Sequence, residues 1–268
     1  MRRWRTEYDM EDNMRRNGAP RKAEPDGTVV VGRNPILELL KSGKDIEKLY
    51  IQRGEREGSI TKIFAEAKKR GIVIAETDKK RLDELSMGNA HQGVAAIVSA
   101  VEYKTVEELV AIARDKGEAP LIVVCDGVED PHNLGAILRC ADGAGAHGVI
   151  VSRRHCPAIG QTVFKASAGA AAHVPIAKVA NIASAVDELK EMGVWIFAAE
   201  ADGVHYKKAD FKGACAIVLG SEGDGVSRLV REKCDFVVSI PMRGAVNSLN
   251  VSTAAAVLLF EASEQQHA

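Results

Sequence analysis

Residues 217–261 read IVLGSEGDGVSRLVREKCDFVVSIPMRGAVNSLNVSTAAAVLLFE, and this stretch decides the fold. Two apolar runs with the length of buried strands, 217–219 and 236–240, each end in a polar loop that leads into a helix. In an open parallel sheet, ligands bind in the crevice outside the carboxyl ends of the strands. We therefore expect the chemistry of this protein to lie in this stretch.

The residues before this stretch continue the same alternation of strand and helix. Near-continuous apolar strands separated by helices are typical of a parallel sheet that is covered on both faces. The predicted fold class of this part is α/β. We expect strands at 121–125, 148–152, 174–176, 194–199, 216–219 and 236–240, and helices near 134–144, 161–168, 182–192, 226–233 and 251–263.

The chain divides into segments of different composition. Residues 1–27 are polar and nearly free of aliphatic side chains, which predicts a disordered tail without a specific role, or one that touches RNA transiently. Residues 28–103 predict a small α/β domain in which Asn34 caps a helix and Phe64 lies on an apolar helix face. Residues 104–120 predict a linker helix, and 121–268 the larger domain.

Composition excludes several classes of protein. The chain has 46% hydrophobic and 27% charged residues, which is typical of a soluble globular protein. The five cysteines lack metal-ligand spacing, so we expect no metal site, and the start of the chain lacks an apolar leader segment. No run approaches the roughly 18 apolar residues of a membrane span. A cytoplasmic protein without a membrane partner fits these features.

Polar residues stand where the predicted strands give way to helices. Asn133 follows the first strand of the larger domain, with Arg139 six positions later, and Ser248 and Asn250 precede the last helix. Each of the three uncharged residues is also a good helix N-cap, and Arg139 could be an ordinary surface residue. Both interpretations stay open on this pattern alone.

Two glycine-rich segments need separate interpretations. Residues 143–148, GAGAHG, match the dinucleotide pattern G-x-G-x-x-G, but they end a helix and precede a strand, which is the reverse of what that motif requires. Gly143 or Gly145 is better interpreted as a helix C-cap. Residues 220–225, GSEGDG, lack the Lys-Ser/Thr of a phosphate-binding loop, yet they follow a buried strand and allow close approach of a ligand to the backbone.

Three ordered motifs resemble those of the SpoU family of RNA ribose 2'-O-methyltransferases, in the SPOUT superfamily. They are N-x-G-x-x-x-R at 133–139, LGSEG-x-G at 219–225 and IPM-x-G-x-V-x-SLNVS at 240–252. The segments VGRNP at 31–35 and HQG at 91–93 look like the substrate-binding domain of that family, similar to ribosomal protein L30e. Domain order and length are most similar to the enzymes that methylate a guanosine of 23S ribosomal RNA in the peptidyl-transferase P loop.

The resemblance implies properties that composition alone does not give. It implies a deep C-terminal trefoil knot that binds S-adenosylmethionine, and a homodimer that packs the knot helices together. The cofactor-binding positions carried onto this chain are Leu219, Gly220, Ile240 and Leu249. The Ala-rich segment 254–256 suits close helix packing at a dimer interface, and a core within one chain explains it equally well.

The resemblance also implies catalytic and RNA-binding residues. Because a guanidinium stays protonated, we expect Arg139 to pair with a phosphate and to stabilise the developing alkoxide rather than to act as a base. We expect Glu222 to orient Arg139 by charge pairing. Asn133, Ser248 and Asn250 would orient the ribose and Arg139, and the predicted RNA-binding residues are Arg33, His91 and Gln92. Methylation of a tRNA, or RNA binding without catalysis, are the alternatives to a 23S ribosomal RNA substrate.

Overall fold

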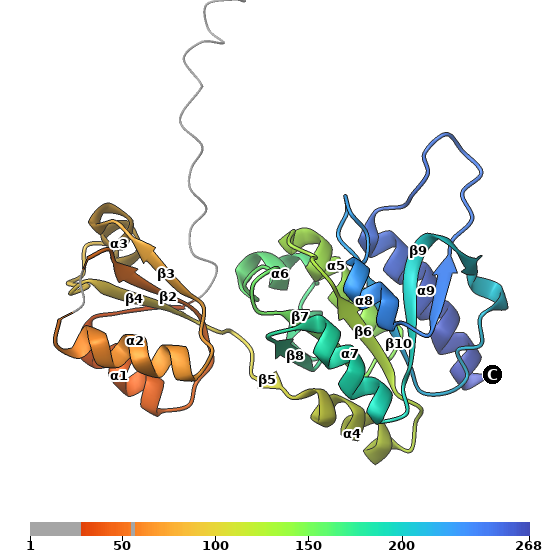
Figure 1. Ribbon diagram of the computed structural model, residues 1–268, viewed down its shortest axis with the longest axis horizontal. Helices are drawn as coiled ribbons and strands as arrows, with labels where there is room; N and C mark the ends of the chain where they lie inside the picture. The colour runs from red at the N-terminus through yellow and green to blue at the C-terminus, as the bar shows by residue number, and fades with distance from the viewer. Residues whose placement is uncertain (1–27, 55–56) are drawn as a thin grey trace, which may run out of the picture.

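The computed structural model of the protein describes residues 28–54 and 57–268, and the predicted disordered tail lies outside these residues. The described residues form two sheets, and the four-stranded sheet precedes the seven-stranded sheet along the chain. Figure 1 shows the two sheets in separate units joined by an extended segment that runs into β5. The larger unit carries the stretch 217–261 that the sequence singles out.

The smaller unit is a mixed sheet with helices on both faces. Its strand order is β1-β4-β2-β3, in which only β2 and β3 are parallel. Helices α1 and α2 bury their apolar residues on one face, and α3 packs on the other. The elements are β1 (Thr28–Val31), α1 (Arg33–Lys41), β2 (Ile46–Gln52), α2 (Ser59–Lys69), β3 (Ile74–Thr77), α3 (Lys79–Ser86) and β4 (Val94–Val98).

The larger unit is built on a fully parallel sheet with the order β11-β9-β10-β6-β7-β8-β5. This confirms the predicted α/β class. The strands are β5 (Tyr103–Lys104), β6 (Leu121–Cys125), β7 (Gly148–Ser152), β8 (Ile176–Val179), β9 (Trp195–His205), β10 (Cys215–Leu219) and β11 (Phe236–Ser239). The helices are α4 (Val106–Lys116), α5 (Pro131–Gly143), α6 (Gln161–Ala166), α7 (Ile182–Glu191), α8 (Arg228–Lys233) and α9 (Val251–His267), with 3₁₀ turns at Ala170–Ala172 and Tyr206–Lys208.

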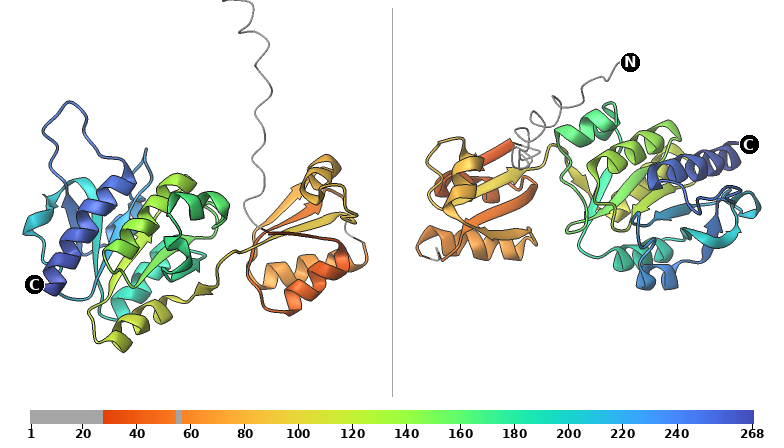
Figure 2. Two further views of the ribbon diagram at one scale, coloured as in Figure 1. Left: turned by 180° about the vertical axis from the view of Figure 1, so that it is seen from behind. Right: turned by 90° about the horizontal axis from the view of Figure 1, so that it is seen from above.

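Helices cover both faces of this sheet, which explains why its strands are apolar throughout. In β6, Leu121, Val123 and Cys125 contribute to the core beneath α5, α6 and α9, whereas Ile122 and Val124 contribute to the core beneath α4, α7 and α8. All five side chains are buried. Figure 2 shows the helices on the two faces of this sheet from behind and from above. The trefoil knot implied by the resemblance stays a prediction.

Several helix starts differ from the sequence-based predictions. Asp130, rather than Asn133, caps α5, because its carboxylate accepts from the backbone N–H of His132 at 2.7 Å and Pro131 occupies the first helical position. In the smaller unit, α1 starts after Gly32, so Asn34 is inside the helix and is not its cap. Phe64 is 38% exposed, since it lies at the edge of the buried face of α2. Gly145, just after α5, has the left-handed conformation that a C-terminal cap requires.

The two units touch through a small set of polar contacts. The ammonium of Lys178 and the hydroxyl of Tyr103 both contact the carboxylate of Glu47, which is buried. Burial of Tyr103 beside Glu47 raises the pKa of its hydroxyl. The Arg153 guanidinium donates to the backbone oxygens of Arg70 and Gly71 at 3.2 and 3.1 Å. These contacts join β2 and the end of α2 to β5, β8 and the residue after β7 in the larger unit.

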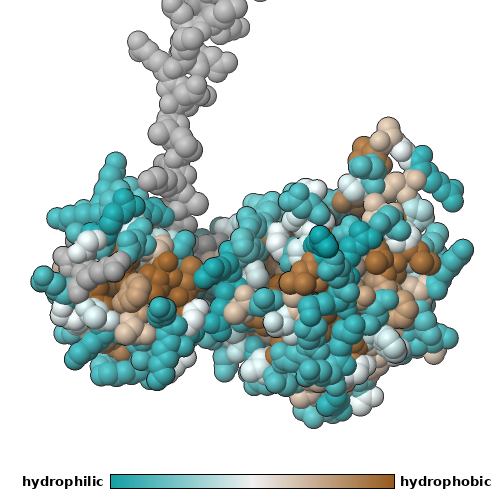
Figure 3. All heavy atoms as spheres, viewed as in Figure 1, coloured by the Kyte–Doolittle hydropathy of each residue, from teal (hydrophilic) through white to brown (hydrophobic). Residues whose placement is uncertain are grey.

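A loop between β11 and α9 projects from the larger unit (Figure 1). It carries Met242 and Val246, which are 37% and 66% exposed, and Figure 3 shows apolar atoms at this projection above a largely hydrophilic surface. Among the described residues, every helix is too short or too polar to cross a lipid bilayer.

Candidate functional site

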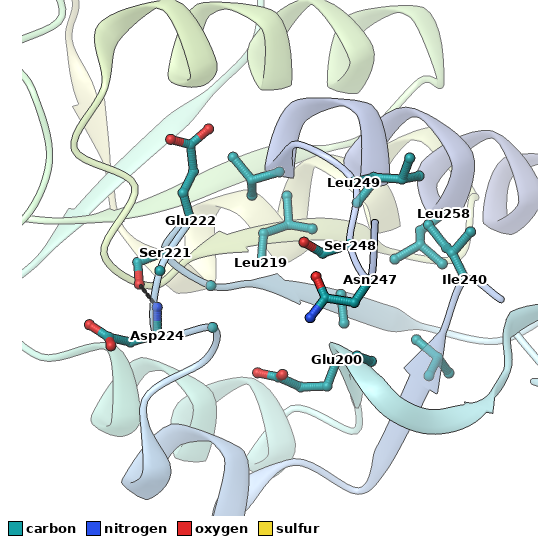
Figure 4. Close-up of a pocket in the computed structure, with 18 of the residues that line it drawn as sticks. Glu200, Leu219, Ser221, Glu222, Asp224, Ile240, Asn247, Ser248, Leu249 and Leu258 are labelled. Atoms are coloured by element: carbon teal, nitrogen blue, oxygen red, sulfur yellow. Dashed lines mark hydrogen bonds between the residues drawn. The ribbon is translucent and has the colours of Figure 1, made fainter. Parts of the chain in front are cut away.

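Loops at the carboxyl ends of the parallel strands enclose a cavity of about 310 Å³. The loops after β10 and β11 line it, together with the first turns of α9 and the second half of β9. The four residues predicted to bind a cofactor, Leu219, Gly220, Ile240 and Leu249, all line this cavity. Figure 4 shows three of them, Leu219, Ile240 and Leu249, with Leu258, as aliphatic walls. The predicted site residue Ser248 lies there as well.

The glycine-rich loop folds back on itself beside the cavity. Ser221 and Gly225 exchange two backbone hydrogen bonds, with N–H to oxygen distances of 3.0 and 3.2 Å. A Cβ atom on Gly220 would lie only 2.0 Å from the backbone carbon of Gly225. Gly225 itself has φ +68°, which favours glycine. These two glycines are therefore required for the closed loop, whereas Gly223 has open space around it.

Strand β9 contributes a segment that sequence analysis missed. Phe197 and Ala198 pair with β11, but the next paired residue is Val204, so residues 199–203 leave the ladder as a long bulge. The bulge places Glu200 on the cavity wall, where its carboxylate accepts from the backbone N–H of Val226 at 2.6 Å. Figure 4 shows this carboxylate directed toward the space between Asp224 and Asn247. The sequence pattern ended the strand at residue 199 and carried no signal for the bulge.

A second cavity, of about 550 Å³, lies on the other side of the glycine-rich loop. Residues 220–224 and Val251 line both cavities, so the loop forms a shared wall. The loop after β6 and the start of α5, including Asn133, complete the second cavity. Four carboxylates line it, from Glu129, Asp130, Glu222 and Asp224, and none of its lining residues among those described is Lys or Arg.

Three predicted site residues meet at this shared wall. The carboxylate of Glu222 accepts from the side-chain amide of Asn133 at 2.8 Å and from that of Asn250 at 2.7 Å. The Asn250 amide also donates to the side-chain oxygen of Asn133 at 2.9 Å. Asn250 caps α9 as well, since its oxygen accepts from the backbone N–H groups of Ser252 and Thr253. Capping therefore uses the oxygen of the terminal amide of Asn250, and the site network uses its nitrogen.

Arg139 lies apart from this network. Its side chain is exposed on α5, it lines neither cavity, and no described residue forms a hydrogen bond or ion pair with it. The predicted charge pairing of Glu222 with Arg139 is therefore wrong within one chain. Glu222 is held by Asn133 and Asn250 instead. The spacing from Asn133 to Arg139 explains the separation, because six residues of helix turn the two side chains to different faces.

The three predicted RNA-binding residues lie close together in the smaller unit. The backbone N–H and Nε of Arg33 donate to the side-chain and backbone oxygens of Gln92 at 3.0 and 2.9 Å. His91 is buried, with Nδ1 accepting from the backbone N–H of Gly93 and Nε2 facing Asp83 at 3.0 Å. The Nε2 atom of His91 therefore carries the proton. RNA binding by these residues stays a prediction.

Comparison with known proteins adds to this geometry. Residues 120–260 match the SpoU rRNA Methylase family, and residues 29–104 match the family of RNA 2'-O ribose methyltransferase substrate-binding domains. This chain belongs to the SpoU methylase family. A relative in Staphylococcus haemolyticus, named as a TrmH family tRNA/rRNA methyltransferase, is 46% identical over 89% of this chain and 96% of its own length.

Solved structures of SpoU-type proteins share the fold. The AdoMet-bound rRNA methyltransferase from Sinorhizobium meliloti is 25% identical, with a TM-score of 0.56 over 88% of this chain and 86% of its own. The TrmH/SpoU tRNA modifying enzyme of A. aeolicus is 30% identical, with a TM-score of 0.52 over 84% of its own chain, but it covers only 60% of this one. This SpoU protein is thus an S-adenosylmethionine-dependent RNA methyltransferase with a substrate-binding domain before its catalytic domain.

The residues of the first cavity fit this cofactor. The adenine ring would find apolar surface on Leu219, Ile240 and Leu258. Gly220 has no side chain, so its backbone groups are accessible to the ring. The only charged lining residues among those described are carboxylates, which complements the positive sulfonium of the cofactor. No group of three or more His, Cys, Asp or Glu residues in the described chain could hold a metal ion.

Proposed function

We propose that this protein transfers a methyl group from S-adenosylmethionine to the ribose 2'-OH of a guanosine in 23S ribosomal RNA, in the peptidyl-transferase P loop. The observation that carries the proposal is the Asn133–Glu222–Asn250 network at the wall between two adjoining cavities. An in-line displacement needs the acceptor oxygen to reach the methyl carbon directly, opposite the sulfur, so donor and acceptor must meet where the two cavities adjoin, beside Glu222 and Val251.

The first cavity would hold the cofactor and the second the acceptor ribose. The cofactor supplies a methyl group that is already activated by a sulfonium. As the C–O bond forms, the C–S bond would break, the neutral thioether would leave with the C–S electron pair, and the hydroxyl proton would pass to solvent water. Amide groups of Asn133 and Asn250, fixed by Glu222, are placed to orient the ribose, and Ser248 approaches it from the cofactor side. Such positioning is the main contribution that protein groups can make to this reaction.

We assign Arg139 to a site completed by a second copy of the chain. An RNA phosphate cannot be neutralised by the second cavity, because that cavity is lined by four carboxylates. The guanidinium of Arg139 is exposed and has no partner among the described residues, so it is free to reach a neighbouring molecule. In a homodimer, Arg139 of one copy would pair with the phosphate and stabilise the alkoxide in the site of the other.

Two features favour ribosomal RNA over tRNA as substrate. Of the two solved structures above, the one named as a tRNA modifying enzyme covers only 60% of this chain, whereas the one named as an rRNA methyltransferase covers 88%. In addition, residues 1–104, which include the substrate-binding domain, contain 21 Lys and Arg against 17 Asp and Glu. A modest excess of positive charge suits a phosphate-rich partner. Within the proposal, the enzyme works in the cytoplasm, where ribosomal RNA is processed.

The proposal is tested by mapping 2'-O-methyl groups in total RNA from a strain that lacks the gene. The proposal expects one guanosine of the 23S P loop to lose its methyl group in that strain and to regain it on complementation. An unchanged P loop with an altered tRNA would establish the tRNA alternative. If the 2'-O-methyl groups of both ribosomal and transfer RNA were unchanged, RNA binding without catalysis would be the remaining function.

A further inference from the structure

The bulge in β9 creates a charged position inside the cofactor cavity. Residues 199–203 have no ladder partner in β11, and Arg231 holds their far end through an ion pair of 2.7 Å with Asp202. The near end carries Glu200, whose carboxylate is fixed on the backbone N–H of Val226. That carboxylate packs over Gly225, because a Cβ atom there would lie 2.7 Å from it. Glu200 is therefore held in one orientation by the glycine-rich loop.

The three carboxylates of this cavity are not equivalent. Glu222 is engaged by two asparagine amides at the shared wall, and Asp224 is exposed on the outer side of the loop. Glu200 is half-buried, and its second oxygen forms no hydrogen bond with any described residue. The guanidinium of Arg231 is near enough to Glu200 to interact with it electrostatically, but it forms its ion pair with Asp202. A half-buried carboxylate that forms no ion pair of its own interacts strongly with a cation that enters the same cavity.

We propose that Glu200 is a specificity-determining residue that makes the cavity prefer S-adenosylmethionine to the reaction product S-adenosylhomocysteine. The substrate carries one net positive charge because of its sulfonium, and the product, a thioether, carries none. Both have the same adenosine and amino-acid groups, so contacts to those groups cannot separate them. A fixed carboxylate can separate them, because it attracts the sulfonium and not the thioether. This preference would help S-adenosylhomocysteine to leave after the reaction.

The test is isothermal titration calorimetry of the purified full-length protein with three ligands. They are S-adenosylmethionine, S-adenosylhomocysteine and sinefungin, an analogue in which an ammonium replaces the sulfonium and no methyl group can move. The variant is Glu200→Gln, whose amide oxygen can still accept from Val226. The matched control is Glu232→Gln on α8, which removes one charge from a residue that lines neither cavity.

Glu200→Gln is expected to weaken both cationic ligands by about tenfold and to leave S-adenosylhomocysteine within about twofold, since a factor of ten corresponds to the worth of one partly screened charge contact. Glu232→Gln should leave all three affinities unchanged. An equal loss for all three ligands would show a contact to the adenosine or amino-acid groups and overturn the proposal. Unchanged affinities would overturn it as well, and the thermal midpoint of the free variant verifies that it is folded.

Discussion

The side-chain amide of Asn250 donates to the side-chain oxygen of Asn133 at 2.9 Å, although 117 positions of sequence separate them. The contact joins the start of α9 to the first turn of α5, at the carboxyl edge of the parallel sheet. Glu222 accepts from both amides and closes the triangle. Each side chain thereby loses rotational freedom before any RNA arrives, which is the condition for effective positioning.

Asn250 has a capping role and a site role, and two substitutions separate them. Asn250→Ser keeps an oxygen for the cap of α9 but removes the amide donor, so stability should stay within about 0.5 kcal/mol of the wild type. Asn250→Ala removes both groups and should cost about 1 kcal/mol. Methyl transfer should fall by about a hundredfold or more in both variants, because the positioning amide is missing from each. Urea unfolding and single-turnover transfer measure the two effects.

A serine variant that is as active as the wild type would contradict the site role and leave Asn250 as a cap only. A serine variant as unstable as the alanine variant would contradict the cap assignment.

The glycine-rich loop offers a matched pair of substitutions. In Gly220→Ala the new methyl group meets the backbone of Gly225 and Val226, so the loop must open, and we expect about 1–3 kcal/mol of destabilisation and at least a tenfold loss of S-adenosylmethionine affinity. Gly223→Ala adds the same methyl group in open space on the same loop and should leave both quantities near the wild type. Calorimetry and thermal unfolding check the pair, and equal effects at the two positions would refute the packing argument.

Arg139 can be placed in one copy or the other by mixing inactive chains. Arg139→Ala and Asn250→Ser are co-expressed with two different tags, and the doubly tagged dimer is purified. If Arg139 completes the site of the second copy, one of the two sites in this dimer is intact, and about half of the wild-type activity returns. If Arg139 acts in the site of its own chain, each of the two sites contains one substitution and both are defective. No recovered activity would therefore reject the assignment. Arg139→Lys in the same assay should stay weak, because lysine lacks the bidentate geometry.

His147 makes the larger unit sensitive to acid. Its ring is buried between β6 and β7, where Nδ1 accepts from the backbone N–H of Leu121 at 3.1 Å and Nε2 lies 2.9 Å from Glu118. Burial lowers the pKa of His147 below its usual 6.5, and the hydrogen bond to Glu118 opposes this only in part. The unfolded chain therefore takes up the proton first. Stability should fall as the pH drops below about 6.5 and level off once the folded protein is also protonated.

His147→Gln removes the titrating ring and should flatten this part of the profile. The thermal midpoint of both proteins between about pH 7.5 and pH 5 provides the measurement. Parallel profiles for wild type and variant would show that another group titrates.

The strand-and-helix alternation predicted the larger sheet because each strand is buried on both faces, so its apolar run carries a strong signal. The start of α5 was harder to predict than the strands, since Asn133 and Asp130 are both residue types that cap helices well. Pro131 in the sequence was the signal that separates them, because proline favours the first helical position. Long-range geometry was the hardest part. The Glu222–Asn250 contact depends on two loops from different strands; the strand pattern placed both loops at one edge of the sheet, but it did not predict this contact.

Glu200 shows where sequence reasoning failed entirely. Alternation along β9 gives no indication that five residues leave the ladder opposite β11, because the bulge depends on the neighbouring strand. The predicted pairing of Glu222 with Arg139 is absent within one chain for a related reason, and a pairing between two chains stays a prediction. Opposite charges in two motifs suggested a contact, but α5 directs Arg139 to a different face from Asn133.

The central claim is that the methyl group goes to a guanosine ribose of 23S ribosomal RNA. The most direct measurement incubates the purified protein and isotopically labelled S-adenosylmethionine with unmethylated 23S rRNA and, separately, with unmethylated tRNA, and identifies the labelled nucleoside by mass spectrometry. The claim predicts labelled 2'-O-methylguanosine from a single P-loop fragment of the 23S rRNA and none from the tRNA. Label on a nucleobase, or 2'-O-methyl label that arises only in the tRNA, would contradict it.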